Sequence, residues 1–457
     1  MLSFRAMSTV DVAEVVDGSR IGPLQVRLFT LCAACLIMDG FDVQAVGYAA
    51  PAIIQEWGVP QAALGPVFGA GNFGVLVGSL IFTMLGDKLG RRPVLIGATL
   101  FFSALTLATA LATSVPELIV IRFIAGIGLG SIIPNATALV GEYSPKRSRI
   151  SLMATISVGF TAGAAVGGFV AAWLIPAFGW RSVFYVGGAV PLVIALLMWW
   201  SLPESLQFLV LRNRGRQAVA GWLKQIDPRL TITPETRFVV AEQQRTGVPV
   251  LHLFREGRAA GTLLLWLVCF MNLYNLYFLS NWLPTVVRGL GYQTSTAVLV
   301  GTTLQVGGTL GTFLLAWLIS RYGFIPVLTT AFAAACVSIA LIGQPGISLA
   351  FLVTVVFIAG TCVVGSQPTV NALAGTFYPT SLRSTGIGWG LGIGRLGAIL
   401  GPVAAGEMIR RQWTTQDLFY SAAVPAALAA VIMLALRVAM KPTLAMHAEE
   451  RAVRADR

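Results

Sequence analysis

The chain has 457 residues, of which 56% are hydrophobic and only 11% are charged, and its mean hydropathy is +0.79. A soluble globular protein carries about 25% charged residues, so this composition excludes that class. The net charge of +12 does not indicate a nucleic-acid partner, because the basic residues are distributed like a membrane topology signal.

Apolar segments recur along the whole chain, and many exceed the roughly 20 residues that cross a bilayer. The chain is therefore predicted to be an all-α, multi-pass membrane protein without a cleaved signal peptide. Twelve transmembrane helices are expected, over residues 24–52, 62–85, 93–113, 117–140, 149–175, 181–202, 260–286, 294–319, 325–344, 347–371, 381–408 and 415–438. The expected organisation is a cytoplasmic N-terminal segment (1–23), a six-helix bundle (24–202), a cytoplasmic linker (203–259), a second six-helix bundle (260–438) and a cytoplasmic tail (439–457).

The first predicted helix contains two acidic residues, Asp39 and Asp42, in an otherwise apolar run. A carboxylate at a bilayer centre costs about 2.5–3.5 kcal/mol by insertion scales, so an intramembrane acid is a candidate functional group. The spacing of three places both on one helix face, where two carboxylates in a low dielectric do not both ionise readily. The pair is expected to couple transport to protons, and the pattern leaves open which aspartate carries the proton. The alternative is a structural hydrogen-bond acceptor in a polar helix interface.

The segment 86–92, GDKLGRR, joins the second and third predicted helices. Asp87 can accept hydrogen bonds from Arg91 or from the first backbone amides of the third helix. Glu142, at the end of the fourth helix, can reach the same charged cluster. Together with Arg92, these residues are predicted to form a latch that breaks and re-forms between conformations. The alternative is a basic topology signal without a moving part.

Two arginines lie inside the predicted membrane region, Arg122 early in the fourth helix and Arg395 in the middle of the eleventh. A guanidinium group matches a carboxylate with two parallel hydrogen bonds and stays protonated, which suits an anion-binding cavity. Arg395 is the better candidate for a substrate carboxylate, because the glycines of GIGRLG are expected to leave space around it. Arg122 is expected to contact substrate or to partner Asp39 or Asp42. The alternative is that both arginines form structural ion pairs.

Lys and Arg also predict the orientation of the chain. With both termini in the cytoplasm, that side holds 25 of the 31 basic residues and the opposite side holds four. The two halves repeat as well: ALVGEYSPKRSR at 138–149 aligns with ALAGTFYPTSLR at 372–383, and GDKLGRRPVL at 86–95 aligns with ISRYGFIPVL at 319–328. Offsets of 234 and 233 residues predict two parallel copies of a six-helix unit, with a substrate site near the midplane between them.

Several motifs resemble those of the major facilitator superfamily: GDKLGRR at 86–92, IRFIAGIGLG at 121–130 and PESLQFLV at 203–210. DGFD at 39–42, together with YPTSLRSTGIGWGLGIGRLGAILGP at 378–402, resembles the aromatic acid:proton symporter family. The resemblance covers residues 24–440. It implies the major facilitator fold and proton-coupled import of benzoate, hydroxybenzoates, protocatechuate or related acids, without specifying one of them.

The second-half loop departs from the superfamily pattern. Ser320 stands at the position of Asp87, and Phe324 and Ile325 stand at the positions of the two arginines. The charged latch is therefore expected in the first half only.

A site for an aromatic acid needs apolar walls and a few polar groups. The candidates lie on the seventh, eighth, tenth and eleventh helices, and each of them could instead serve core packing or the membrane interface. They are Asn272, Tyr274, Asn275, Tyr277, Phe278, Gln305, Asn371 and Trp389.

No sequence motif indicates an enzyme, a cofactor or a metal. His252 and His447 lie in predicted cytoplasmic segments without metal-ligand spacing, and the chain has no GxxxxGK[ST] motif for a nucleotide. The prediction is a proton-coupled importer of small aromatic carboxylates in a bacterial-type inner membrane, whose partners are the acid, protons and the lipid bilayer. The alternatives are a symporter of another organic acid or a cation on the same fold, and a non-transporting membrane sensor. Two intramembrane arginines disfavour a cation.

Overall fold

The computed structural model describes residues 9–233, 236–240, 250–379 and 382–455; parts of the predicted N-terminal segment, linker and tail lie outside them. The long helices of the first half are α2 (Pro23–Trp57), α3 (Gly65–Leu89), α4 (Arg91–Thr109), α5 (Val115–Leu129), α6 (Ile132–Tyr143), α7 (Arg149–Phe178) and α8 (Arg181–Ser201). Those of the second half are α11 (Ala259–Gly289), α12 (Thr294–Tyr322), α13 (Phe324–Ile342), α14 (Leu349–Val363), α15 (Ser366–Phe377), α16 (Arg383–Arg410) and α17 (Thr415–Ala455). The shorter elements are β1 (Thr9–Asp11), α1 (Val12–Gly18), η1 (Gln61–Leu64), α9 (Leu206–Leu211), α10 (Arg216–Ile226), β2 (Arg237–Val239) and η2 (Val250–Phe254).

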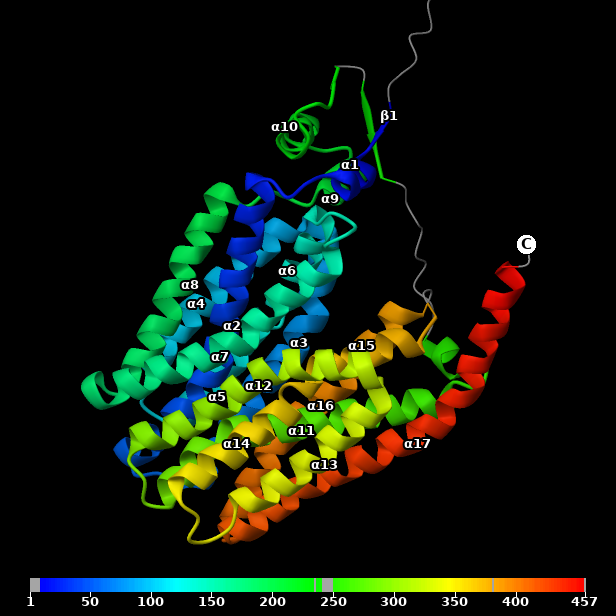
Figure 1. Ribbon diagram of the computed structural model, residues 1–457. Coiled ribbons are helices and arrows are strands. Elements are labelled where there is room, and N and C mark those ends of the chain that lie inside the picture. The colour runs from blue at the N-terminus through cyan, green and yellow to red at the C-terminus, as the bar shows by residue number, and fades with distance from the viewer. Residues whose placement is uncertain (1–8, 234–235, 241–249, 380–381, 456–457) are drawn as a thin grey trace, which may run out of the picture.

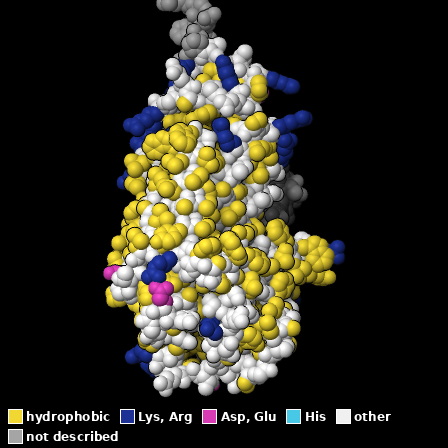
Figure 2. All heavy atoms as spheres, turned by 90° about the vertical axis from the view of Figure 1, so that its left-hand side faces the viewer, with side chains coloured by type: hydrophobic (Ala, Val, Ile, Leu, Met, Phe, Trp, Pro, Cys, Tyr) yellow, Lys and Arg dark blue, Asp and Glu magenta, His cyan; other side chains and the backbone are white. Residues whose placement is uncertain are grey.

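The outer surface of the helices is suited to lipid. Within the described residues, eleven spans are long and apolar enough to cross a membrane, and α2 taken together with α1 makes a twelfth. Figure 2 shows hydrophobic side chains over much of one face, with Lys and Arg gathered toward the end that carries the linker elements. α8, which lies on the left-hand side of Figure 1 and so on the face shown in Figure 2, exposes Trp199 (60%) and Trp200 (75%). The prediction of an all-α, multi-pass membrane fold is confirmed.

Helix boundaries repeat at the predicted offset. α4 and α13 begin 233 residues apart and end 233 residues apart, and for α6 and α15 both differences are 234. Because the copies contain the same helices in the same order and direction, the prediction of two parallel six-helix repeats is confirmed.

The spans predicted over 117–140 and 347–371 are present as Val115–Tyr143 and Leu349–Phe377, and each contains one short break that the sequence did not predict. Two residues separate α5 from α6, and two separate α14 from α15. At the first break the backbone N–H of Ser131 donates to the carbonyl oxygen of Gly128, three residues earlier (3.2 Å), which tightens the turn. The hydrophobic pattern does not reveal such a break, because the apolar residues continue through it.

The N-terminal segment and the linker fold together at one end of the first half (Figure 1). β1 and β2 form a two-stranded parallel sheet in which Thr9 lies opposite Arg237. α10 buries Val219, Leu223 and Ile226 at helical spacing, in one apolar cluster with α1 and the start of α2. The sequence had predicted only a polar connection here.

The two halves touch at the end of the molecule opposite the linker. A Cβ added to Gly406 of α16 would lie 3.0 Å from the Cα of Gly65 of α3, and one added to Gly69 would lie 2.5 Å from Val403 Cγ2. Toward the linker the same helices diverge (Figure 1). Gly388 lies about five turns before Gly406 on the same face of α16, and an added Cβ there would meet no heavy atom within 4 Å. The halves are therefore closed against each other at one end and apart at the linker end.

Candidate substrate and proton site

A buried ion pair joins α2 to α5. Arg122 Nη1 donates to Asp42 Oδ1 (3.2 Å) and Nη2 donates to Oδ2 (2.8 Å). Thr106 of α4 also donates to Asp42 Oδ1 (2.6 Å). Asp42 is fully buried and Arg122 is 4% exposed. The sequence left three partners open for Arg122: substrate, Asp39 or Asp42. In the structure the partner is Asp42, and both terminal nitrogens of the guanidinium group donate to it.

Asp39 lies one turn earlier on α2, in different surroundings. It is 2% exposed, and its Oδ2 has no hydrogen-bond partner among the described residues. Gly40 serves close packing here, because an added Cβ would lie 1.8 Å from the carbonyl oxygen of Phe160 on α7. A buried carboxylate without partners is costly when ionised, so Asp39 is chemically suited to exchange a proton.

Arg395 approaches this region from the second half. It is half-buried in the middle of α16, and its Nη1 donates to the hydroxyl of Tyr277 on α11 (3.2 Å). The expectation that Gly394 and Gly397 leave room for a ligand is wrong, because α11 fills that space. A Cβ added to Gly394 would lie 2.6 Å from Leu273 Cδ1 of α11. A Cβ added to Gly397 would lie 2.2 Å from the carbonyl oxygen of Phe270 of the same helix. The glycines hold the two helices close together, which fixes Arg395 beside Tyr277.

Asn272 and Asn371, two of the predicted substrate contacts, are linked through Gln367, a residue that the sequence did not single out. Asn272 Nδ2 donates to Gln367 Oε1 (2.7 Å), and Gln367 Nε2 donates to Asn371 Oδ1 (3.4 Å). Asn272 Oδ1 is buried without a partner among the described residues. Gln367 lies at the start of α15, directly after the break in the span, and a polar residue at that place in an apolar run was the available signal.

A second amide network crosses between the halves. Gln305 Nε2 donates to Ser280 Oγ (2.9 Å) and to Gln44 Oε1 (3.3 Å), and Gln44 Nε2 donates to the carbonyl oxygen of Ser280 (2.5 Å). Gln305 was a predicted site residue, whereas Gln44 and Ser280 were missed. Gln44 lies two residues after Asp42 in the same apolar run, which was a usable signal.

Other predicted contacts point elsewhere. The amide of Asn275 faces α17, where its Nδ2 donates to the carbonyl oxygen of Ala422 (2.8 Å). Phe278 packs edge-on against Phe419 of the same helix, and its other face stacks on Tyr274. Trp389 is 46% exposed and stacks on Trp266 of α11, with ring centroids 5.8 Å apart. These four predicted residues are therefore not gathered with the buried charges in this conformation.

The predicted latch is formed in part. Arg91 and Glu142 make an ion pair. Asp87 is exposed, and none of the hydrogen bonds and ion pairs found among the described residues involves it. The place expected for Asp87, at the N-terminus of α4, is taken by Glu204, whose Oε1 accepts from the backbone N–H groups of Arg91 and Arg92 (both 3.0 Å). An anion is favourable at that end of a helix.

This charged cluster lies within the first half. Arg92 donates to the carbonyl oxygen of Trp199 at the end of α8, and Tyr143 donates to the backbone oxygen of Glu204 (2.7 Å). In the second-half loop Ser320 donates to the carbonyl oxygen of Trp317 on its own helix (2.7 Å). Glu204 belongs to the PESLQFLV motif, so an acidic residue directly after a membrane helix was the signal that the analysis did not use.

Two six-helix repeats that close against each other at one end, with charged and amide side chains buried between them, define a multi-pass membrane transporter of the alternating-access type. The chain belongs to the major facilitator superfamily: residues 32–402 and 265–456 match the profile described as "Major Facilitator Superfamily". It is a transporter and not an enzyme.

Relatives cover nearly the whole chain. It is 40% identical over 425 residues to the 4-hydroxybenzoate transporter PcaK of Pseudomonas putida (93% of this chain, 95% of the relative). It is 38% identical over 427 residues to the gallate transporter of Pseudomonas putida (93% and 95%) and 32% identical over 429 residues to the benzoate transport protein of Acinetobacter baylyi (92% and 91%). The crystal structure of the D-xylose-proton symporter has the same fold, with a TM-score of 0.71 at 18% identity over 89% of this chain and 97% of that one.

Proposed function

We propose that this chain imports small aromatic carboxylates together with protons, by alternating access, across a bacterial-type inner membrane. The observation that carries the proposal is the state of Arg395. It is a permanent cation in the middle of a membrane helix, and among the described residues its one hydrogen bond goes to a neutral hydroxyl, that of Tyr277. Arg122, the other intramembrane cation, is already held by Asp42. A ligand carboxylate is the partner that Arg395 lacks.

The relatives support the aromatic class of substrate. The names of three of them specify 4-hydroxybenzoate, gallate and benzoate, each a benzene ring that carries a carboxylate. Asn272, Gln305 and Asn371 remain candidates for further polar contacts to the substrate.

The two aspartates are assigned different roles in proton coupling. Asp42 is paired with Arg122 and accepts a further hydrogen bond from Thr106, so its carboxylate already has protein partners. Asp39 lacks such partners, because its buried Oδ2 has none among the described residues. We therefore assign the transported proton to Asp39, while the substrate carboxylate binds Arg395. Substrate and proton are thereby carried together.

The end that carries the linker is assigned to the cytoplasm, because 25 of the 31 basic residues belong to segments predicted on that side. α1 and α10 pack at this end (Figure 1). The α3–α4 loop lies against the start of the linker, because a Cβ added to its Gly90 would lie 2.4 Å from Glu204 Oε2, and Asp87 just before this loop is exposed. The described conformation, with the halves apart there, is then the inward-facing one. The cluster of Arg91, Glu142 and Glu204 is the candidate latch, with Asp87 free to join it or to contact the second half when the cytoplasmic end closes.

The experiment that tests the carboxylate site compares an acid with its neutral analogue. Binding of benzoate and of benzamide to purified protein is measured by calorimetry for the parent, Arg395→Lys and Arg395→Ala. A charge-assisted hydrogen bond contributes about 1.5–3 kcal/mol, so Arg395→Ala is expected to bind benzoate roughly ten- to a hundred-fold more weakly. Lys keeps the charge but not the planar fork, so an intermediate loss is expected. Binding of benzamide should change little.

The matched control is Arg321→Ala, which removes a cation of the same half. Arg321 lies over the ring of Trp317 near the linker end of α12, away from the buried charges. That variant should bind benzoate like the parent. If Arg395→Ala also bound benzoate like the parent, the carboxylate site would lie elsewhere.

A further inference from the structure

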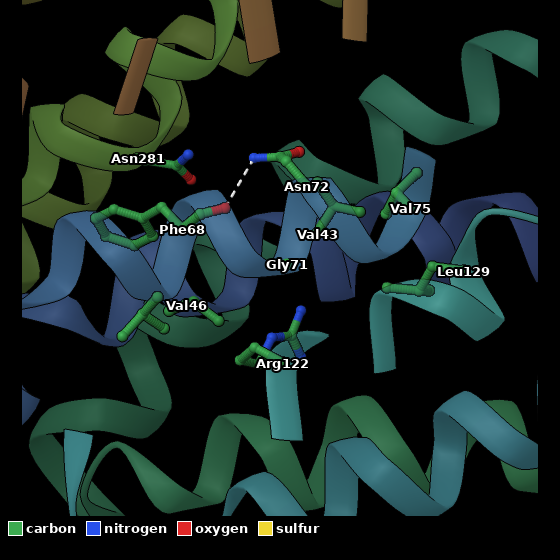
Figure 3. A pocket seen from close by; sticks show the side chains of 10 residues that line it. Val43, Val46, Phe68, Gly71, Asn72, Val75, Arg122, Leu129 and Asn281 are labelled. Atoms are coloured by element: carbon green, nitrogen blue, oxygen red, sulfur yellow. Dashed lines mark hydrogen bonds between the residues drawn. The ribbon is translucent and has the colours of Figure 1, made fainter. Parts of the chain in front are cut away.

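A small pocket lies beside the Asp42–Arg122 pair, where α2, α3, α5 and α11 meet (Figure 3). Its cavity volume is about 20 Å³, enough for roughly one water molecule or one hydroxyl group. Its walls are mostly apolar, with Val43 and Phe68 among them, and its polar side chains are Asn72, Arg122 and Asn281. A recess of this size, with polar groups that converge on it, suits one polar substituent of a ligand and not a whole ring.

The amide of Asn281 is the unexplained group in this pocket. It is 3% exposed, and its Nδ2 has no hydrogen-bond partner among the described residues. Asn72 differs, because its Nδ2 donates to the carbonyl oxygen of Phe68 on its own helix (3.1 Å; Figure 3). A buried donor without a partner costs folding free energy and stabilises nothing within the protein. The amide of Asn281 is therefore suited to meet an atom that the protein itself does not supply.

The pocket adjoins the proposed carboxylate site. Asn281 follows Tyr277, the partner of Arg395, by four residues on α11, which places it on the same face about 6 Å further from the linker end. Val43 links the two places, because it lines the pocket and packs against the cluster that contains Tyr277. One helical turn is comparable to the length of a benzene ring with substituents at opposite ends. A ring held by its carboxylate at Arg395 would bring its far substituent to Asn281.

We propose that Asn281 is a specificity residue that hydrogen-bonds a ring hydroxyl of the aromatic acid. This inference rests on the proposed function, since it needs the carboxylate at Arg395. A hydroxyl both accepts and donates, so it can pair with an amide that presents either its nitrogen or its oxygen. An acid with the hydroxyl gains a hydrogen bond that an acid with an unsubstituted ring cannot make, so the amide distinguishes the two acids.

The test measures the preference between two acids. Affinities of purified protein for 4-hydroxybenzoate and benzoate are determined by calorimetry for the parent, Asn281→Leu and Asn281→Ala. The parent is expected to bind 4-hydroxybenzoate about ten-fold more tightly than benzoate, equivalent to about 1.4 kcal/mol. Both variants should lose this preference while keeping the parent's affinity for benzoate. Leu has nearly the shape of Asn, and since the Nδ2 bonds nothing in the fold, Asn281→Leu should melt at the parent's temperature or above.

The control is Asn275→Ala, which removes an amide from the same helix but from the side that faces α17. It should keep the preference. The inference is overturned if both Asn281 variants keep the preference, if they lose affinity for the two acids equally, or if the parent has no preference. A parent that binds neither acid contradicts the proposed function itself and not the assignment of Asn281 alone.

Discussion

Single residues of α2 show how similar side chains acquire different chemistry from their neighbours. Asp42 receives three side-chain hydrogen bonds, two from Arg122 and one from Thr106, while Asp39 one turn away has an oxygen with none among the described residues. The free energy of a buried charge depends on such compensation. The two carboxylates should therefore differ in what their removal does to stability.

The stability difference gives a prediction. Asp42→Asn removes the countercharge of Arg122 and leaves that guanidinium buried, so the free energy of unfolding should fall by about 3–5 kcal/mol. Asp39→Asn changes a buried carboxylate whose Oδ2 has no hydrogen-bond partner among the described residues and should leave stability unchanged or slightly raised. Thermal unfolding of the two variants in the same detergent measures this. The double variant Asp42→Asn with Arg122→Gln should be more stable than the two single effects added together. Equal melting temperatures for the two aspartate variants would contradict the assignment.

At this scale the sequence could predict which residues are polar inside the membrane, but not which way each one faces. Asn272 and Asn275 looked equivalent, yet Asn272 bonds Gln367 of α15 and Asn275 faces α17. Most of the second half of α11 is buried, so no exposed polar stripe in its sequence distinguishes one face from another. The partner of an intramembrane arginine is underdetermined for the same reason, because distance along the chain says nothing about which helix packs against it.

Among the elements, helix ends and breaks are where backbone groups need partners. The N-terminus of α4 receives the carboxylate of Glu204 on two of its N–H groups, although the nearest acid in sequence is Asp87. Glu204 can do so because the chain after α8 returns to the start of α4. The sequence predicted an acid at this helix end but named the adjacent one, because a contact across 113 residues cannot be assigned from the residues around α4 alone.

Glu204→Ala should therefore destabilise the first half. Removing a side chain that caps a helix N-terminus costs about 0.5–2 kcal/mol, and this carboxylate also accepts from the backbone N–H of Ser205. Asp87→Asn, the control, removes a charge from an exposed side chain and should leave the melting temperature unchanged. Thermal unfolding of both variants measures the effect. If Asp87→Asn were the more destabilising change, the cap would belong to Asp87.

For the whole molecule, the relevant feature is that the halves meet along one part of their boundary only. Gly69 of α3 meets Val403, whereas Leu80, eleven residues on and on nearly the same face, is 65% exposed. The duplicated sequence predicted two parallel copies of one six-helix unit, and the coincident helix ends bear this out. It could not predict which end is closed, because the same residues must form both conformations of an alternating-access cycle.

The closed end can be tested with a wedge. Gly168 of α7 faces the second half, and an added Cβ would lie 2.0 Å from Thr302 Oγ1 of α12. Gly168→Val should therefore destabilise the contact opposite the linker and shift the population toward the conformer closed at the linker end. A cysteine at Gly388, where the structure leaves open space, reports on that end. Its labelling by a polar maleimide should slow several-fold in the wedge variant. The five native cysteines are buried or half-buried, so they should contribute little labelling.

The matched control is Gly97→Val, the same substitution at a glycine where an added Cβ meets no heavy atom within 4 Å. It should leave the labelling rate of the cysteine at position 388 unchanged, and this separates the wedge from a general effect of valine in a membrane helix. Faster labelling in Gly168→Val would mean that the wedge only loosens the molecule. An unchanged rate would mean that the contact of α7 with α12 does not select the conformation, which would leave α3 and α16 to do so.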